Sequence, residues 1–334
     1  VLFWIGLGFL GILLALFGIF YKNILLAYLA AGIVSLLFLL ISNRKLFRSI
    51  HPGFIFAAAL IAFFFLLVAN FSSPTIFSGR DQGSLSEAAI RLAQNHQLKF
   101  SFPAEKDFFQ IYGPGKALDF PGFNYTQDGQ LITQFPLGYV SWLAIFYSIL
   151  GSNGLILANG ILFFIFLISF YLLLRNTLRV SSSLIGILFV LTSFIFSWFF
   201  KFTLSENMAL AFSWFGIWSF VIFLTNKKQF YLLSSILSFG LLAFARIEAL
   251  AFIFMLVLTL YLISRRQKIC FFDLVGKKAI WISGLMGFTY LISLYVNSQF
   301  FVTLAKAVIR PAENGALFSS NFFSSLLYTF KLFF

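Results

Sequence analysis

Charged residues, cysteine and histidine are all scarce in this chain of 334 residues, and each shortage excludes a class of protein. Only 10% of the residues are charged, against roughly 25% in soluble domains. The single cysteine, Cys270, excludes an internal disulfide. With only two histidines, the chain has no Cys/His cluster of the kind that binds zinc. The chain is therefore neither an ordinary soluble domain nor a disulfide or zinc scaffold.

Hydrophobic residues, in contrast, make up 61% of the chain and recur in long runs. Runs of about 20 apolar residues are long enough to cross a bilayer as helices, so the fold class predicted is an all-α, polytopic transmembrane bundle. The net charge of +13 comes mostly from short loops between spans and does not indicate a nucleic-acid partner. The runs predict about 9–10 spans: 1–20, 24–42, 53–71, 154–174, 184–200, 207–224, 230–245, 247–263, 279–297 and a partial one from 321.

Basic residues predict how the spans are oriented. Four short segments hold 12 of the 23 Lys and Arg residues, and the positive-inside bias places these segments in the cytoplasm. They are 43–51, 175–183, 225–229 and 264–278. The long loop 72–135 is then outside, and so are the helix turns at 201–207 and 245–248. Nine of the ten acids fall outside by this topology, and only Asp273 falls inside.

Two apolar stretches need a separate interpretation. Because the loop 72–135 is outside and the segment 175–183 is inside, an odd number of spans must connect them. We therefore expect 154–174 to cross the membrane and 136–150 to lie in the outer interface or to re-enter. Pro136, Trp142, Tyr139 and Tyr147 suit such an interfacial segment. The pattern Gly6-x-Gly8-x-x-Gly11 matches a dinucleotide motif but lies inside a span, where it predicts helix packing.

The outer loop is predicted to begin with a surface helix. Ser84-Leu85-Ser86-Glu87 matches a capping box, with Ser84 as N-cap and Glu87 reaching back to it. The helix that follows, about 84–98, is amphipathic and suited to lie on the membrane surface. Beyond it, the Gly/Pro/aromatic-rich stretch 111–129 predicts turns with exposed rings, either an acceptor surface or plain packing on the interface.

Four titratable residues stand out on the predicted outer side. Asp81 directly follows a span, and its alternative role is a structural acid paired with Arg80 or capping a turn. Glu206 opens a span, where the helix macrodipole alone favours an acid. Arg246 and Glu248 interrupt an apolar run, and ionisable groups at membrane depth usually line an internal cavity, although a hairpin with a mutual ion pair remains the alternative.

These motifs together resemble the polytopic glycosyltransferases of the GT-C superfamily, in the branch of protein O-mannosyltransferases and aminoarabinose transferases. In that family a span ends in an essential Asp or Asp-Glu followed by a juxtamembrane helix, as in GRDQGSLSEAAIRLAQNHQL at 79–98. Three further motifs follow in order: QFPLGYVSWLAIFYSILG at 134–151, LSENMAL at 204–210 and LLAFARIEAL at 241–250. This chain departs from the family in having Asp-Gln at the acidic motif and two additional spans before it.

The resemblance implies an inverting glycosyltransferase that moves a sugar from a polyprenyl-phosphate donor to a protein, lipid or glycan acceptor outside the membrane. Asp81 would be the catalytic base, since a positioned carboxylate can take the acceptor's proton. Arg246 would bind the donor phosphate through its planar fork, with Glu248 orienting it. Glu206 would hold the sugar hydroxyls, support Asp81 or help to bind a cation. Arg80 and Lys116 would be further substrate-binding cations, and a divalent Mg or Mn ion is the candidate cofactor.

The same resemblance divides the chain into an N-terminal helix pair, 1–51, and a catalytic membrane domain, 52–334, truncated at its C-terminus. It places the protein in a bacterial or archaeal plasma membrane. Two other classes are compatible with hidden charges among spans: a transporter or lipid flippase, and an O-antigen ligase or polymerase-like transferase. The acids cluster at one face rather than at mid-bilayer, which favours the glycosyltransferase over a transporter.

Overall fold

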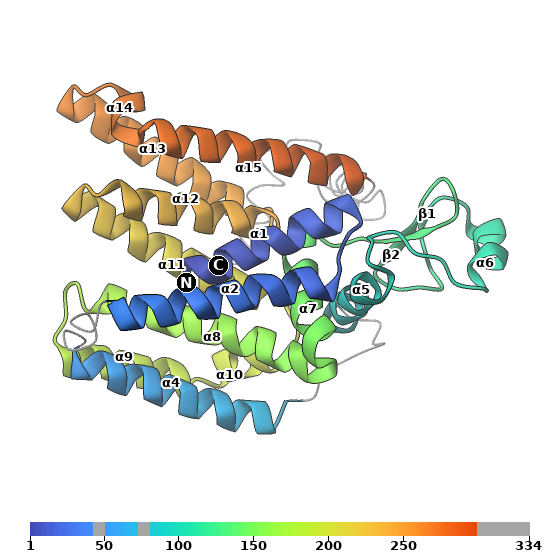
Figure 1. The fold of residues 1–334 in the computed structure, drawn as a ribbon, viewed down its shortest axis with the longest axis horizontal. Helices are drawn as coiled ribbons and strands as arrows, with labels where there is room; N and C mark the ends of the chain where they lie inside the picture. Colours follow the sequence, from blue (N-terminus) through green and yellow to red (C-terminus); the bar gives the residue numbers. More distant parts are fainter. Residues whose placement is uncertain (43–50, 73–80, 299–334) are drawn as a thin grey trace, which may run out of the picture.

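A computed structural model describes residues 1–42, 51–72 and 81–298 of the protein. Long helices run side by side and form a bundle (Figure 1). A smaller module of short helices and strands, residues 81–133, protrudes from one end, which we call the loop end (Figure 1). The turns at 175–179, 227–228 and 268–270 lie at the opposite end.

Within the described residues, six helices are long and apolar enough to cross a membrane, and they make this an all-α, multi-pass membrane protein. A seventh span is counted if α9 (Val180–Leu191) and α10 (Phe194–Lys201), bent by 60° at their junction, cross together. The six are α2 (Lys22–Ser42), α4 (Pro52–Asn70), α8 (Ser152–Leu174), α11 (Ser205–Asn226), α13 (Ala249–Gln267) and α15 (Lys277–Val296).

Fewer helices pass this test than the 9–10 spans predicted. Helices α1 (Leu2–Phe17) and α12 (Gln229–Ala243) are apolar but have only 16 and 15 residues. At 1.5 Å per residue they extend about 24 and 23 Å, less than the roughly 30 Å hydrocarbon core. The partial span expected from 321 lies outside the described residues.

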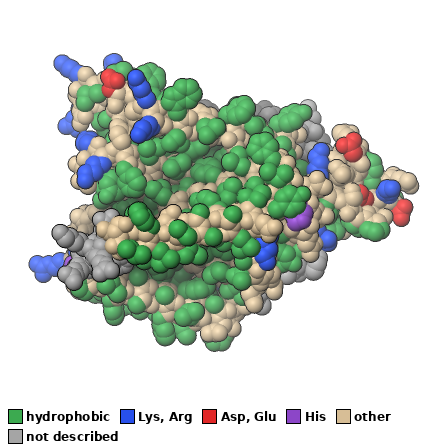
Figure 2. Space-filling model, in the orientation of Figure 1, with side chains coloured by type: hydrophobic (Ala, Val, Ile, Leu, Met, Phe, Trp, Pro, Cys, Tyr) green, Lys and Arg blue, Asp and Glu red, His purple; other side chains and the backbone are tan. Residues whose placement is uncertain are grey.

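The surface carries an apolar band between two polar ends (Figure 2). Side chains on α2, α4 and α15 are largely unburied although these helices are strongly apolar, as expected for faces that contact lipid. Lys and Arg side chains gather at the end opposite the loop module, where the predicted cytoplasmic segments 175–183, 225–229 and 264–278 lie (Figure 2). The basic residues of 43–51 lie outside the described residues. Helix α14 (Phe271–Val275) also lies at this end, opposite the loop module.

The core of the loop end is built on α7 (Leu137–Leu150), which packs against α1, α5 and α8. Its residues Leu137–Phe146 are all buried, so Trp142 and Tyr139, which suit an interfacial segment, are covered by other parts of the protein instead of facing lipid headgroups. The Trp142 indole donates to the carbonyl of Ala158 at 3.1 Å, which satisfies its N–H inside the protein. The prediction that α8, rather than α7, makes the crossing agrees with their lengths of 23 and 14 residues.

Glycines bring α1 into this same core. A Cβ on Gly8 would lie 2.9 Å from a Leu241 methyl of α12, and one on Gly11 would lie 2.7 Å from Ile145 of α7. A Cβ at either position would force the Leu241 or Ile145 side chain to shift, so glycine allows these helices to approach closely. The prediction that the glycine pattern serves helix packing is confirmed.

The loop module contains regular structure where turns with exposed rings were predicted. It holds α5 (Asp81–Asn95), α6 (Glu105–Tyr112) and a three-stranded antiparallel sheet of order β1-β2-β3. The strands are β1 (Gly115–Lys116), β2 (Phe123–Tyr125) and β3 (Leu131–Thr133). Phe123 and Tyr125 are 1% and 0% exposed, and rings from Phe100 and Phe120 pack against Phe123. The expectation of exposed rings is therefore wrong for this cluster, which forms a small core.

The capping box predicted for α5 is also wrong. The helix already includes Asp81, so Ser84 lies inside it and its hydroxyl donates to the carbonyl of Pro121 at 3.2 Å. Glu87 pairs forward with Arg91, whose Nε lies 2.7 Å from its Oε1, instead of reaching back. Residues 83–90 are buried and α5 packs on α7, so this helix does not lie free on the membrane surface as predicted.

Candidate functional site

Three of the predicted site residues meet at the loop end, where α11 begins and where α12 turns into α13. Nη1 of Arg246 lies 2.7 Å from Oε1 of Glu206, and its Nη2 lies 2.9 Å from Oε1 of Glu248. The turn 244–248 presents Arg246 and Glu248, while the first helical turn of α11 presents Glu206. We call these three side chains the charged triad.

The Arg246 guanidinium is almost fully occupied within the triad. Its Nε donates to Oε2 of Glu248 at 3.3 Å, which makes the pair bidentate, and Nη1 also donates to the Ser205 hydroxyl at 3.2 Å. A guanidinium has five N–H donors, so these contacts leave one. An incoming phosphate must use that donor or replace a carboxylate. Glu248 is the carboxylate that can leave, because 69% of its side chain is exposed.

The triad combines two carboxyl groups with one guanidinium group. Burial disfavours the charged Arg246, but hydrogen bonding to Glu248 and the charge of Glu206 outweigh burial and raise its pKa above the ordinary value. The hydrogen bond from Arg246 holds the pKa of the Glu248 carboxyl below its usual range, although burial opposes this. Arg246 and Glu248 are therefore both ionised at neutral pH in this arrangement.

Asp81 lies at a separate but adjacent hollow. The hollow has a volume of about 410 Å³ and is lined by Asp81, Gln82, Trp198, Phe202 and Leu204. Asp81 is exposed, and within the described part of the chain its carboxylate makes no hydrogen bond or ion pair. Asp81 thus forms part of the wall of this hollow.

One short segment forms a wall of the Asp81 hollow and also supplies partners of Arg246. Leu204 lines the hollow, and Glu206, two residues later, binds Arg246. Two residues span at most about 7 Å of chain. The Thr203 hydroxyl donates to the carbonyl of Gln82 at 2.8 Å and shares a 2.7 Å hydrogen bond with Ser86, so the segment is tied to the helix that bears Asp81.

A buried amide network holds the start of this segment in place, and the sequence did not predict it. Nδ2 of Asn159 and Nδ2 of Asn207 both donate to the carbonyl of Phe202 at 2.9 Å. The Tyr139 hydroxyl donates to Oδ1 of Asn159 at 2.7 Å. The available signal was Asn159 itself, since a polar amide in the middle of an apolar span needs a buried partner.

The remaining predicted residues are not part of this arrangement. Lys116 is exposed on β1 in the loop module, and no described contact joins it to Asp81 or to the charged triad. Arg80 lies outside the described residues. In residues 1–42, 51–72 and 81–298, His, Cys, Asp and Glu side chains do not gather in groups of three or more that could hold a metal ion. The divalent cation stays a prediction.

Comparisons with known proteins found no relative of this chain. No protein-family model, no curated protein and no solved structure matches the chain.

Proposed function

We propose that this protein is a glycosyltransferase of the GT-C kind, which moves a sugar from a polyprenyl-phosphate donor to an acceptor hydroxyl at the extracytoplasmic face of the membrane. The observation that carries the proposal is the segment 202–206, because it adjoins the Asp81 carboxylate, which has no ion-pair partner among the described residues, at one side and an arginine at the other. A proton acceptor and an anion-binding group beside each other are what this transfer needs.

Asp81 serves as the general base in the proposed reaction. The acceptor oxygen attacks the anomeric carbon, its proton passes to the Asp81 carboxylate, and a new C–O bond forms. The bond between the anomeric carbon and the phosphate oxygen breaks, and polyprenyl phosphate leaves with the electron pair. Direct displacement inverts the anomeric configuration. The hollow of about 410 Å³ beside Asp81 receives the acceptor and the sugar.

Arg246 stabilises the charge of the leaving phosphate. Because Glu248 occupies two of its donors in the present arrangement, the phosphate takes the place of that exposed carboxylate. Glu206 and Ser205 stay on Nη1 and keep the guanidinium plane in position during the exchange. The two carboxylates thus have different roles: Glu248 is displaced by the donor and Glu206 orients the arginine.

The test is transfer from radiolabelled polyprenyl-phosphate sugars, offered as a panel to membranes that contain the full-length protein. Removing a general base lowers the rate by roughly 10²–10⁴-fold, so Asp81→Asn should lose nearly all transfer. Arg246→Ala should do the same. Asp107→Asn is the matched control, because Asp107 is an exposed acid on α6, outside the hollow.

Full transfer by both Asp81→Asn and Arg246→Ala would show that the site assignment is wrong. If no lipid-linked sugar in the panel is consumed while a solute crosses sealed vesicles, the transporter hypothesis replaces the enzyme hypothesis.

A further inference from the structure

Basic side chains gather at the end opposite the loop module, which we call the basic end (Figure 2). The segment 264–278, which contains α14, holds five cations and one acid, Asp273. All six of these side chains are exposed, and among the described residues none of them takes part in an ion pair. Positive charge concentrated at a membrane boundary attracts anionic headgroups.

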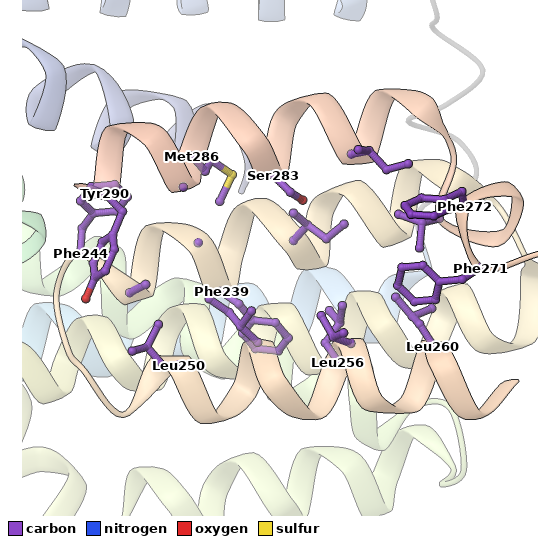
Figure 3. Close-up of a pocket in the computed structure, with 18 residues that line it drawn as sticks. Phe239, Phe244, Leu250, Leu256, Leu260, Phe271, Phe272, Ser283, Met286 and Tyr290 are labelled. Carbon is purple, nitrogen blue, oxygen red and sulfur yellow. The ribbon is translucent and has the colours of Figure 1, made fainter. Parts of the chain in front are cut away.

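Helix α14 lies where the apolar interior of the bundle ends. An apolar cavity of about 440 Å³ lies between α12, α13 and α15, and Phe271 and Phe272 of α14 line it at the basic end (Figure 3). The span α15 begins at Lys277, two residues after α14 ends. The charged surface therefore starts directly beyond α14, at the level where a bilayer has its headgroups.

A second basic turn is fixed beside α14. Gln229, the first residue of α12, donates from Nε2 to the carbonyl of Leu274 at 2.8 Å. A Cβ on Gly276 would lie 3.5 Å from the same glutamine side chain. Two lysines, 227–228, directly precede Gln229, and two more, 277–278, directly follow Gly276. The hydrogen bond thus brings two pairs of lysines together, and we call these four residues the lysine quartet.

The quartet is exposed and lacks acidic partners. All four side chains are exposed, and within the described part of the chain no carboxylate forms an ion pair with any of them. The Lys227 ammonium also lies 5.9 Å from the centroid of the Phe223 ring, which holds this side chain near the turn. The quartet therefore has four positive charges to offer to an anion.

Each lysine pair is followed by an exposed aromatic ring on the side of the helix bundle. Phe230 in the first turn of α12 is 60% exposed, and Trp281 of α15 is 80% exposed. Trp281 lies four residues after Lys277 and so shares its helix face. Tryptophan is enriched at headgroup level in membrane proteins. Cations beside exposed rings fit a molecule with an anionic headgroup and acyl chains, rather than a soluble anion.

We propose that the lysine quartet binds the phosphate of an anionic bilayer phospholipid, whose acyl chains lie along Phe230 and Trp281. The site goes beyond the proposed function and is independent of it, because it lies at the opposite end of the bundle from Asp81 and the charged triad. Phosphatidylglycerol carries a net negative charge and phosphatidylcholine carries none, so the quartet should select the former.

Trp281 offers a direct measurement of which lipid lies beside the quartet. The full-length protein is placed in phosphatidylcholine vesicles that contain either brominated phosphatidylglycerol or brominated phosphatidylcholine, and bromine quenches nearby tryptophan fluorescence. The signal of Trp281 is the difference between the wild type and Trp281→Phe. We expect phosphatidylglycerol to be preferred about tenfold at this position.

Removing either pair of charges should abolish the preference. Lys277→Gln/Lys278→Gln should lower it about tenfold, which is about 1.4 kcal/mol and is of the size expected for one to two lysines near an anionic surface. Lys227→Gln/Lys228→Gln should have the same effect and serves as the second variant if the first does not fold. Lys277→Arg/Lys278→Arg keeps both charges and should keep the preference.

Two further variants separate a built site from general surface attraction. Gln229→Met removes the hydrogen bond to Leu274 without changing the charge, and it should lower the preference about threefold. Arg175→Gln/Arg179→Gln removes two charges from a different turn at the basic end. It is the matched control and should leave the preference unchanged.

Equal quenching of wild-type Trp281 by the two lipids would overturn the proposal. So would a control pair that loses as much preference as the quartet variants, because the attraction would then be general. A full preference in Gln229→Met would show that the two lysine pairs do not form one site. If lipid preference is absent and soluble poly-glutamate binds the wild type but not Lys277→Gln/Lys278→Gln, the quartet binds an acidic protein instead. None of these outcomes depends on sugar transfer.

Discussion

The hydroxyls of Ser86 and Thr203 share a hydrogen bond of 2.7 Å although 117 positions separate them in the chain. Ser86 belongs to α5, which begins at Asp81, and Thr203 belongs to the segment that leads to Glu206. Thr203 is buried and bonds the carbonyl of Gln82 as well. Among the described residues, these hydrogen bonds connect the helix that bears Asp81 with the segment that leads to the charged triad.

Removing the Thr203 hydroxyl should therefore affect stability and transfer together. Thr203→Val removes both of these hydrogen bonds, while the Ser86 hydroxyl still donates to the carbonyl of Gln82 at 2.9 Å, so the cost should be about 0.5–1.5 kcal/mol. We expect a lower melting temperature in detergent and slower transfer, because Asp81 loses its fixed position. Thr203→Ser should recover most of both, while Thr225→Val, at an exposed helix end, should change neither. If Thr203→Val has the melting temperature and transfer rate of the wild type, this contact does not couple the Asp81 hollow to the charged triad.

The Arg246–Glu248 pair should make stability depend on pH. Since the folded state holds the pKa of Glu248 below the ordinary value of 4.5, the pair stabilises the protein fully above pH 4.5. This contribution disappears as pH falls through the lowered pKa. An exposed pair is worth less than about 1 kcal/mol, so the effect is small.

The measurement is a melting curve of wild type and Glu248→Gln between pH 7 and pH 3. The wild type should melt higher at pH 7, and the difference should narrow below pH 4.5. A difference that stays constant across this range would show that Glu248 stabilises the fold by another route.

Six of the predicted spans and the charged triad could be predicted from the sequence because their causes are local. An apolar run such as 154–174 is stable only inside a membrane or a protein core, whatever the sequence of the rest of the chain. Arg246 and Glu248 are two residues apart, and the parity of crossings brought Glu206 to the same end. Both predictions depended only on the order of the residues along the chain.

The structure of the loop module could not be predicted in this way, because its contacts join residues that are far apart in the sequence. Ser84 was expected to cap α5, but it is engaged by the carbonyl of Pro121, 37 positions later. The strand Phe123–Tyr125 has three residues, too few for a period of two to be read. Its rings are buried by Phe100 and Phe120, contacts that depend on how the loop folds back on itself.

Orientation in the membrane is open to a direct check through the single cysteine. Cys270 is exposed between α13 and α14, in the segment 264–278 that the positive-inside bias places in the cytoplasm. An impermeant maleimide should label it in inverted vesicles and leave it unlabelled in right-side-out vesicles. Lys116→Cys in a Cys270→Ser background should give the reverse pattern. Labelling of Cys270 from outside would invert the proposed topology and remove the extracytoplasmic site.

The contact between α7 and the turn that carries Arg246 should be intolerant of a single methyl group. The Gly138 N–H donates to the carbonyl of Phe244 at 2.7 Å, and a Cβ on Gly138 would lie 2.7–2.9 Å from backbone atoms of Phe244 and Ala245. Backbone cannot rotate away as a side chain can, so Gly138→Ala must push the turn outward.

We expect Gly138→Ala to cost about 1–3 kcal/mol, as overpacking of a core does, and to move Arg246 relative to Glu206. Gly284→Ala, on the open face of α15, is the control and should be neutral or slightly stabilising. Melting temperature reports the first effect, and KM for the lipid donor reports the second. A loss of stability with an unchanged KM would mean that the turn keeps Arg246 in place even when α7 is forced away, and that Glu206 alone positions the guanidinium.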